Sequence, residues 1–138
     1  MASYRLLEHT ADMGIEASAA TLEELFVEAA RGLTEILFGV IEASPFVEET
    51  VTIGGADREE LLVNWLNEIL FLFEIRSLVP LDFQVSEVGK DFLKGVVRGT
   101  PFDPKEHLVQ REVKAATYHQ VKVEKRDDLW RARVYLDL

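Results

Sequence analysis

The chain has 138 residues, the usual size of one domain with one hydrophobic core. Lys and Arg number 15 against 25 Asp and Glu, and the resulting formal net charge of −10 disfavours general binding to nucleic-acid backbones. The absence of cysteine excludes disulfides, thiolate zinc sites and cysteine nucleophiles. The first residues lack the apolar core of a signal peptide, and the longest apolar cluster, Ile69 to Phe73, is too short to span a membrane. We therefore expect one cytoplasmic domain over residues 1–138, without membrane contact.

Two segments carry the capping signals and the periodicity of helices. The first opens at Thr21, with Glu24 in the capping-box position, and apolar residues then recur at helical spacing. The second opens at Asp57, with Glu60 in the same position. Its apolar residues cover so much of the circumference that we expect a central core helix covered on two sides. A partner or dimer surface around Phe71 is the alternative.

The rest of the chain alternates between apolar and polar residues as strands do. Strands are expected over residues 4–8, 13–18, 46–53, 81–88, 92–98, 112–116, 118–124 and 130–138. Gly89-Lys90-Asp91 predicts a hairpin turn. In the last strand, one face is apolar, and the opposite face carries Arg131, Arg133, Tyr135 and Asp137. This order of elements predicts an α+β fold of two layers, in which two main helices pack on a mixed or antiparallel sheet.

The segment Glu8-His9-Thr10-Ala11-Asp12-Met13-Gly14 places several polar side chains between two short apolar runs. One interpretation is an ordinary connection in which Asp12 caps a turn through its own backbone. The other has Asp12, together with His9, pointing into a polar site at the end of a strand. The spacing leaves both interpretations open.

The end of the sequence carries a second group of anionic atoms. Asp137 precedes the last residue, so its carboxylate is close to the terminal carboxylate and the carbonyl of Leu138. Two such groups repel each other unless a cation or a basic neighbour screens them. Arg133, on the same face of the expected strand, is one candidate. A hard cation such as calcium or magnesium is the other, because these ions take oxygen ligands, main-chain carbonyls included.

A charged connection precedes the last three strands. Asp103-Pro104 predicts a turn, and Lys105 follows it. Glu112 and Lys114 are expected on one face of the next strand, where an exposed ion pair between them would contribute about 0–1 kcal/mol.

Five segments, in this order along nearly the whole chain, resemble the archease family. They are residues 8–14, Thr21-Leu22-Glu23-Glu24-Leu25-Phe26, Leu61-Leu62-Val63-Asn64-Trp65-Leu66-Asn67-Glu68, Glu112-Val113-Lys114-Ala115-Ala116-Thr117-Tyr118-His119 and Asp137-Leu138. Met13 stands where isoleucine or leucine is expected, which is a mild departure.

The resemblance implies an accessory protein without catalytic activity of its own. Archeases assist the GTP-dependent RNA ligase of the RtcB type, which joins RNA ends in tRNA splicing and RNA repair. They promote guanylylation of the active-site histidine of the ligase, permit multiple turnovers and broaden the nucleotides that the ligase accepts. The ligase holds the manganese and performs the covalent chemistry.

The resemblance also implies where the functional residues lie. A divalent-metal site, usually occupied by calcium, maps onto Asp12, Asp137 and the main-chain oxygen of Leu138. Two positions that act in ligase activation map onto Lys105 and Glu112.

Outside these assignments, His9 and Lys114 are candidates for contacts around the metal site. Two other functions stay open from the residues alone. One is a general chaperone or interaction module that uses the apolar second helix. The other is a small metal-dependent hydrolase using Asp12, His9 and Glu112, against which the absence of any known catalytic motif argues.

Overall fold

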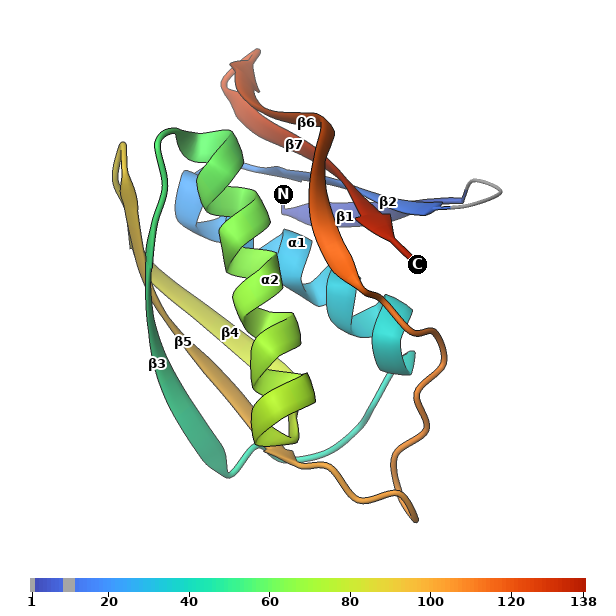
Figure 1. Cartoon of the computed structure of the whole chain (residues 1–138). Coiled ribbons are helices and arrows are strands. Elements are labelled where there is room, and N and C mark those ends of the chain that lie inside the picture. The colour runs from blue at the N-terminus through green and yellow to red at the C-terminus, as the bar shows by residue number, and fades with distance from the viewer. Residues whose placement is uncertain (1, 9–11) are drawn as a thin grey trace.

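Seven strands and two helices form the fold of the computed structural model, which describes residues 2–8 and 12–138 (Figure 1). In chain order the elements are β1 (Ser3–Glu8), β2 (Asp12–Ala19), α1 (Leu22–Phe38), β3 (Val47–Gly54), α2 (Arg58–Arg76), β4 (Leu78–Val88), β5 (Phe92–Pro101), β6 (Ala115–Arg126) and β7 (Leu129–Asp137).

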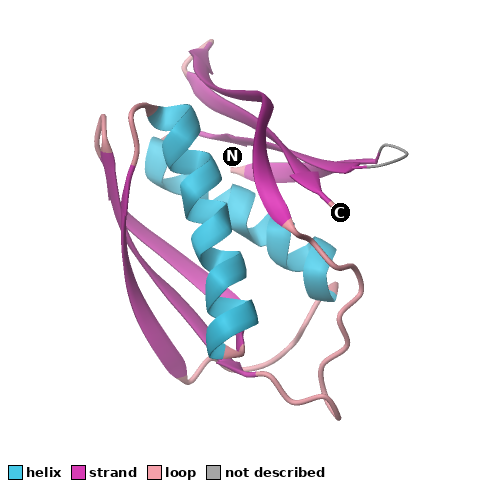
Figure 2. Ribbon diagram, viewed as in Figure 1, coloured by secondary structure: helices cyan, strands magenta, loops and turns pink. Residues whose placement is uncertain are grey.

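The strands form two antiparallel sheets with the two helices between them (Figure 2). One sheet has the order β1-β2-β7-β6 and the other β3-β5-β4. The α+β class, the antiparallel pairing and the two main helices are confirmed. The division into two sheets differs from the expected single sheet, because alternation shows which face of a strand is buried but not which strand lies beside it.

The helices begin where the capping signals place them. Thr21 Oγ1 accepts a hydrogen bond from the Glu24 N–H at 3.2 Å, and Asp57 Oδ1 accepts one from the Glu60 N–H at 2.8 Å. Each carboxylate or hydroxyl satisfies an N–H that has no partner within the helix. α1 ends at Gly39, whose φ of 72° suits glycine because no Cβ is present.

α2 is the central helix, as its broad apolar surface indicates. Its neighbours are β6 on one side and β3, β4 and β5 on the other. Trp65 is fully buried, and its indole N–H donates to the carbonyl of Phe26 on α1 at 2.9 Å. The exposed residues of α2 lie towards its C-terminal end, where Phe71 and Ile75 are 45% and 66% exposed. Within the described part of the chain, no helix is both long and apolar enough to cross a membrane.

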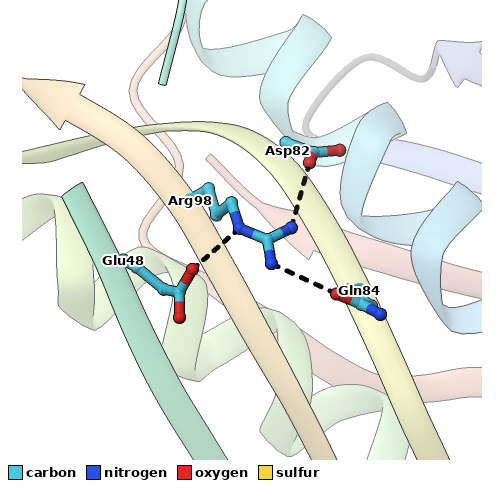
Figure 3. A network of polar contacts seen from close by, with 4 residues as sticks. All are labelled: Glu48, Asp82, Gln84 and Arg98. Carbon is cyan, nitrogen blue, oxygen red and sulfur yellow. Dashed lines mark hydrogen bonds and ion pairs between the residues drawn. The ribbon is translucent and has the colours of Figure 1, made fainter. Parts of the chain in front are cut away.

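The β3-β5-β4 sheet is joined on its solvent side by Arg98 of the central strand β5 (Figure 3). Its guanidinium donates to Glu48 on β3 at 2.9 Å, and to Asp82 and Gln84 on β4 at 3.5 and 3.3 Å. The hydrogen bond to Glu48 and the attraction of both carboxylates raise the pKa of Arg98 above its ordinary value. One side chain thereby links all three strands.

Candidate functional site

The structure places Asp12 and Asp137, from opposite ends of the sequence, directly opposite each other. They form the terminal pair between the two strands, at the start of β2 and the end of β7. Residues directly opposite in an antiparallel pair point to the same face, with Cβ atoms roughly 4.5–5.5 Å apart. Asp12 is half-buried and Asp137 is exposed. We call this pair the acidic tip.

The register of β2 and β7 fixes the acidic tip. Met13 and Ile15 of β2 point into the core, and a slip by one residue would turn them to solvent and the acids inward. Gly14 lies opposite Tyr135 next to the tip, and a Cβ on Gly14 would come within 2.8 Å of the tyrosine ring. The glycine therefore leaves room for the ring on the same face as the two carboxylates.

The acidic tip suits a hard divalent cation, although its side chains supply only part of a coordination shell. Carboxylate oxygens are the ligands that calcium and magnesium prefer. Among the described residues, no group of three or more Asp, Glu or His side chains is placed to hold a metal ion. The other ligands of such an ion would have to be main-chain oxygens, such as that of Leu138, or water. His9 lies outside the described residues.

The alternative explanation for Asp137, an ion pair with Arg133, does not hold in the structure. It is on the same face as Asp137 but lies four residues along β7, directly opposite Glu16 on one side and Lys122 on the other. Its guanidinium forms no ion pair with Asp137, both residues lying in the described part of the chain.

Glu112 and Lys114 lie in the connection before β6, so the strand predicted over residues 112–116 begins too early. The sequence alternates there, but only the Lys114 N–H joins the sheet, where it donates to the Asp137 carbonyl at 2.8 Å. Both side chains are exposed, and no ion pair joins them, which corrects the expected pairing within this described segment. Lys114 therefore anchors the chain beside the tip through its backbone.

Lys105 lies at the other end of the same connection, on the turn predicted at Asp103-Pro104. The Asp103 carboxylate accepts from the Lys105 N–H at 2.9 Å, and the Asp103 N–H donates to His107 Nδ1 at 2.9 Å. The adjacent Phe102 N–H donates to the carbonyl of Ser77, which caps the end of α2. Lys105 is thus exposed beside the end of α2, and no described contact joins it to the acidic tip.

The middle of this connection contacts β1 and the last turn of α1. Arg111 Nη1 lies 3.4 Å from Glu8 Oε1, at the end of β1. The Gln110 N–H donates to the carbonyl of Leu37, in the last turn of α1, at 2.7 Å. These contacts fix the path of the chain between Lys105 and Glu112.

Asn67 of α2 holds β6 in place beside the acidic tip, a role that the sequence patterns did not indicate. Its side-chain amide accepts from the Ala116 N–H at 2.8 Å and donates to the Ala116 carbonyl at 3.3 Å. It therefore takes the place of a neighbouring strand along the edge of β6, next to the residue that pairs with Asp137. The signal in the sequence is a pair of asparagines, Asn64 and Asn67, in the central part of α2, where most other side chains are apolar.

Comparison with known proteins identifies the family to which this chain belongs. Residues 4–138 match the model of the archease protein family. The chain is 42% identical to the archease of Methanopyrus kandleri over 135 residues, covering 96% of each chain. It is 39% identical to that of Pyrococcus furiosus over 142 residues, covering the whole of both.

Solved structures agree with this assignment. The solution structure of Methanobacterium thermoautotrophicum protein 1598 matches with a TM-score of 0.82 and 33% identity, over 99% of both chains. The crystal structure of a Thermotoga maritima archease, described as a possible chaperone, matches with a TM-score of 0.62 and 26% identity over 96% of this chain and 94% of that one. The chain belongs to the archease family.

Proposed function

We propose that this protein is a non-catalytic accessory factor that activates an RtcB-type RNA ligase. In this proposal it promotes guanylylation of the ligase, permits multiple turnovers and broadens the nucleotides that are used. Membership of the archease family supports the proposal, and the observation on which it most depends is the direct pairing of Asp12 with Asp137.

The residues at the tip have separate parts in this proposal. Asp12 and Asp137 would hold a divalent cation, with calcium as the first candidate, together with the main-chain oxygen of Leu138. When bound, that ion supplies positive charge that cancels the repulsion of the two carboxylates. Glu112, exposed and two residues before the backbone anchor at Lys114, would contact the ligase from beside the tip.

Lys105 would contact the ligase at a separate point, because it lies on the turn beside the end of α2. Two contact points on one connection, whose path is held by Gln110 and Arg111, would fix the orientation of the tip against a cationic, phosphate-binding cleft. The overall charge of −10 favours approach to such a cleft.

A general chaperone role has less support from the structure. The apolar surface that would bind unfolded clients is largely buried between the two sheets, and eight residues of α2 are buried. Phe71 and Ile75 are open, but they cover a small part of the helix.

The test is a guanylylation and ligation assay with limiting ligase, comparing this protein with its Asp12→Asn and Asp137→Asn variants. We expect each variant to reduce ligase turnovers at least tenfold while the protein stays folded. The matched control is Asp128→Asn, which makes the same change in the turn at the far end of β7. Asp128 has a φ of 64°, a conformation that asparagine also adopts.

Two outcomes would contradict the proposal. Stimulation by both tip variants equal to that of the unchanged protein would remove the acidic tip from the function. Absence of any stimulation by the unchanged protein would reject ligase activation itself.

A further inference from the structure

A groove on the outer face of the β1-β2-β7-β6 sheet concentrates positive charge on this acidic protein. It has a volume of about 600 Å³. Five of its lining side chains are basic and two are acidic: Arg5, Lys122, Arg126, Arg131 and Arg133, with Glu16 and Glu124. One third of the 15 Lys and Arg residues therefore gather in one place on a chain with a net charge of −10.

Strand register produces this concentration of charge. Arg5, Glu16, Arg133 and Lys122 lie opposite one another across β1, β2, β7 and β6. Arg131 lies on the same face of β7, two residues before Arg133 and roughly 7 Å from it along the strand. The core-facing residues between them are buried, so the register cannot slip to separate the cations.

The two acids of the groove are already engaged. Glu16 pairs with Arg5, and Glu124 lies 3.5 Å from Arg126. Within the described residues no carboxylate lies at ion-pair distance from Lys122, Arg131 or Arg133, although Glu124 is directly opposite Arg131 and Glu16 is directly opposite Arg133.

Two of these cations face each other, which costs stability. Lys122 is directly opposite Arg133, and like charges in such a pair repel. The Nε of Arg133 is also buried and has no hydrogen-bond partner in the described part of the chain. An unpaired buried donor beside two like charges is unfavourable unless an anion contacts them.

We propose that this groove binds a compact polyphosphate group, of the kind carried by a nucleoside triphosphate. Arginine matches phosphate oxygens with two parallel hydrogen bonds, and three cations within one cross-strand cluster suit several adjacent negative charges. The volume lies in the range of small-ligand sites. This binding site is separate from the acidic tip and does not depend on ligase activation.

A long nucleic acid fits the groove less well than a compact ligand. A polyanion that extends beyond the groove meets a protein of net charge −10 and is repelled. Binding of single strands also uses aromatic side chains on which bases stack. Tyr4, the aromatic residue of the lining, has its hydroxyl bonded to Glu35 of α1 at 2.7 Å and its ring close to Gly32. It is therefore engaged with the helix layer.

Isothermal titration of the full chain at low salt tests the proposal, with inorganic triphosphate and GTP in separate arms. We expect both to bind, and the double variant Lys122→Gln/Arg133→Gln to bind at least tenfold more weakly. Lys90→Gln/Lys94→Gln, on the other sheet, is the matched control and should bind as the unchanged protein does. Glu124→Gln removes a competing acid and should tighten binding.

The variants also carry a check on folding. Because Lys122 and Arg133 repel each other, the double variant should melt no lower than the unchanged protein in the absence of ligand. The rise in melting temperature caused by triphosphate should disappear in that variant only.

Three results would overturn the proposal. The first is failure of triphosphate to bind at millimolar concentration. The second is equal binding by the groove variant and the unchanged protein. The third is binding of a short single-stranded RNA, lost in the groove variant, that is tighter than that of triphosphate; it would assign the groove to a nucleic-acid backbone instead.

Discussion

Neutralising one carboxylate of the acidic tip should have opposite effects on the protein with and without a divalent ion. The relevant variants are Asp12→Asn and Asp137→Asn, which keep the size of the side chain and remove its charge. Because the two residues are directly opposite in the sheet, their charges repel in the absence of an ion. Removing either charge removes that repulsion.

The size of the effect follows from the separation. At about 5 Å, two unit charges repel by about 0.8 kcal/mol in water and about 3 kcal/mol at an effective dielectric constant of 20. Asp137 is exposed, so the lower end applies, and we expect each variant to gain about 1 kcal/mol in the absence of an ion. For a chain of this length that raises the melting temperature by about 3–5 °C.

The ion should reverse the order of stability. A ligand at 100 times its dissociation constant stabilises the folded state by about 2.7 kcal/mol. We therefore expect calcium to raise the melting temperature of the unchanged protein above that of either variant, and to leave both variants almost unaffected. Asp128→Asn should respond to calcium as the unchanged protein does.

Thermal unfolding followed by circular dichroism, in chelator and in a calcium series, measures both effects. Two results would refute the reasoning. If both variants are less stable than the unchanged protein in chelator, the two carboxylates do not repel as their register implies. If both retain the full response to calcium, the ion binds elsewhere.

Three further predictions concern the packing that supports the tip and the sheets. Asn67→Ala loses both hydrogen bonds to the main chain of β6 and should lower the free energy of unfolding by about 1–3 kcal/mol in urea titrations; an unchanged midpoint would contradict the role assigned to that side chain. Gly99→Ala places a Cβ 2.0 Å from the Val79 carbonyl oxygen and should cost about 3 kcal/mol in the same assay, whereas Gly54→Ala, whose Cβ meets the Asp91 carbonyl oxygen at an ordinary contact distance of 3.9 Å, should cost far less. Burial and a hydrogen bond to the Glu35 carboxylate raise the pKa of Tyr4 to about 12. The stability that Tyr4 contributes is therefore complete below pH 10, its ordinary pKa, and is lost as the pH rises towards 12. The unfolding midpoint of Tyr4→Phe should fall less steeply with pH across that window than that of the unchanged protein, and equal slopes would refute the assignment.

Capping residues and hydrophobic periodicity predicted the helices and most of the strands. The capping boxes at Thr21 and Asp57 placed both helix starts, because a cap is decided by side chains within one turn of the helix. The strand predicted from Glu112 shows the limit of such signals. Its alternation is genuine, but the chain is held there by contacts with α1 and β7, so pairing starts only at Ala115.

The sequence also singled out Asp12 and Asp137 as candidate ligands, yet their position relative to each other depended on the fold. No local pattern specifies that β2 lies beside β7, since the choice of neighbouring strand depends on how both bury their apolar faces against α1 and α2. The same holds for the basic groove. The face shared by Arg131 and Arg133 could be predicted from alternation, but the approach of Lys122 and Arg5 to that face could not.

By itself, the sequence determined the helices with their caps, most of the strands and the family, because each depends on residues close together in the chain or on motifs in order. The tertiary structure alone decided the division into two sheets, the pairing of the two aspartates and the gathering of cations on one face. These features depend on strand register between distant segments, which burial of the shared core fixes only when the whole chain has folded.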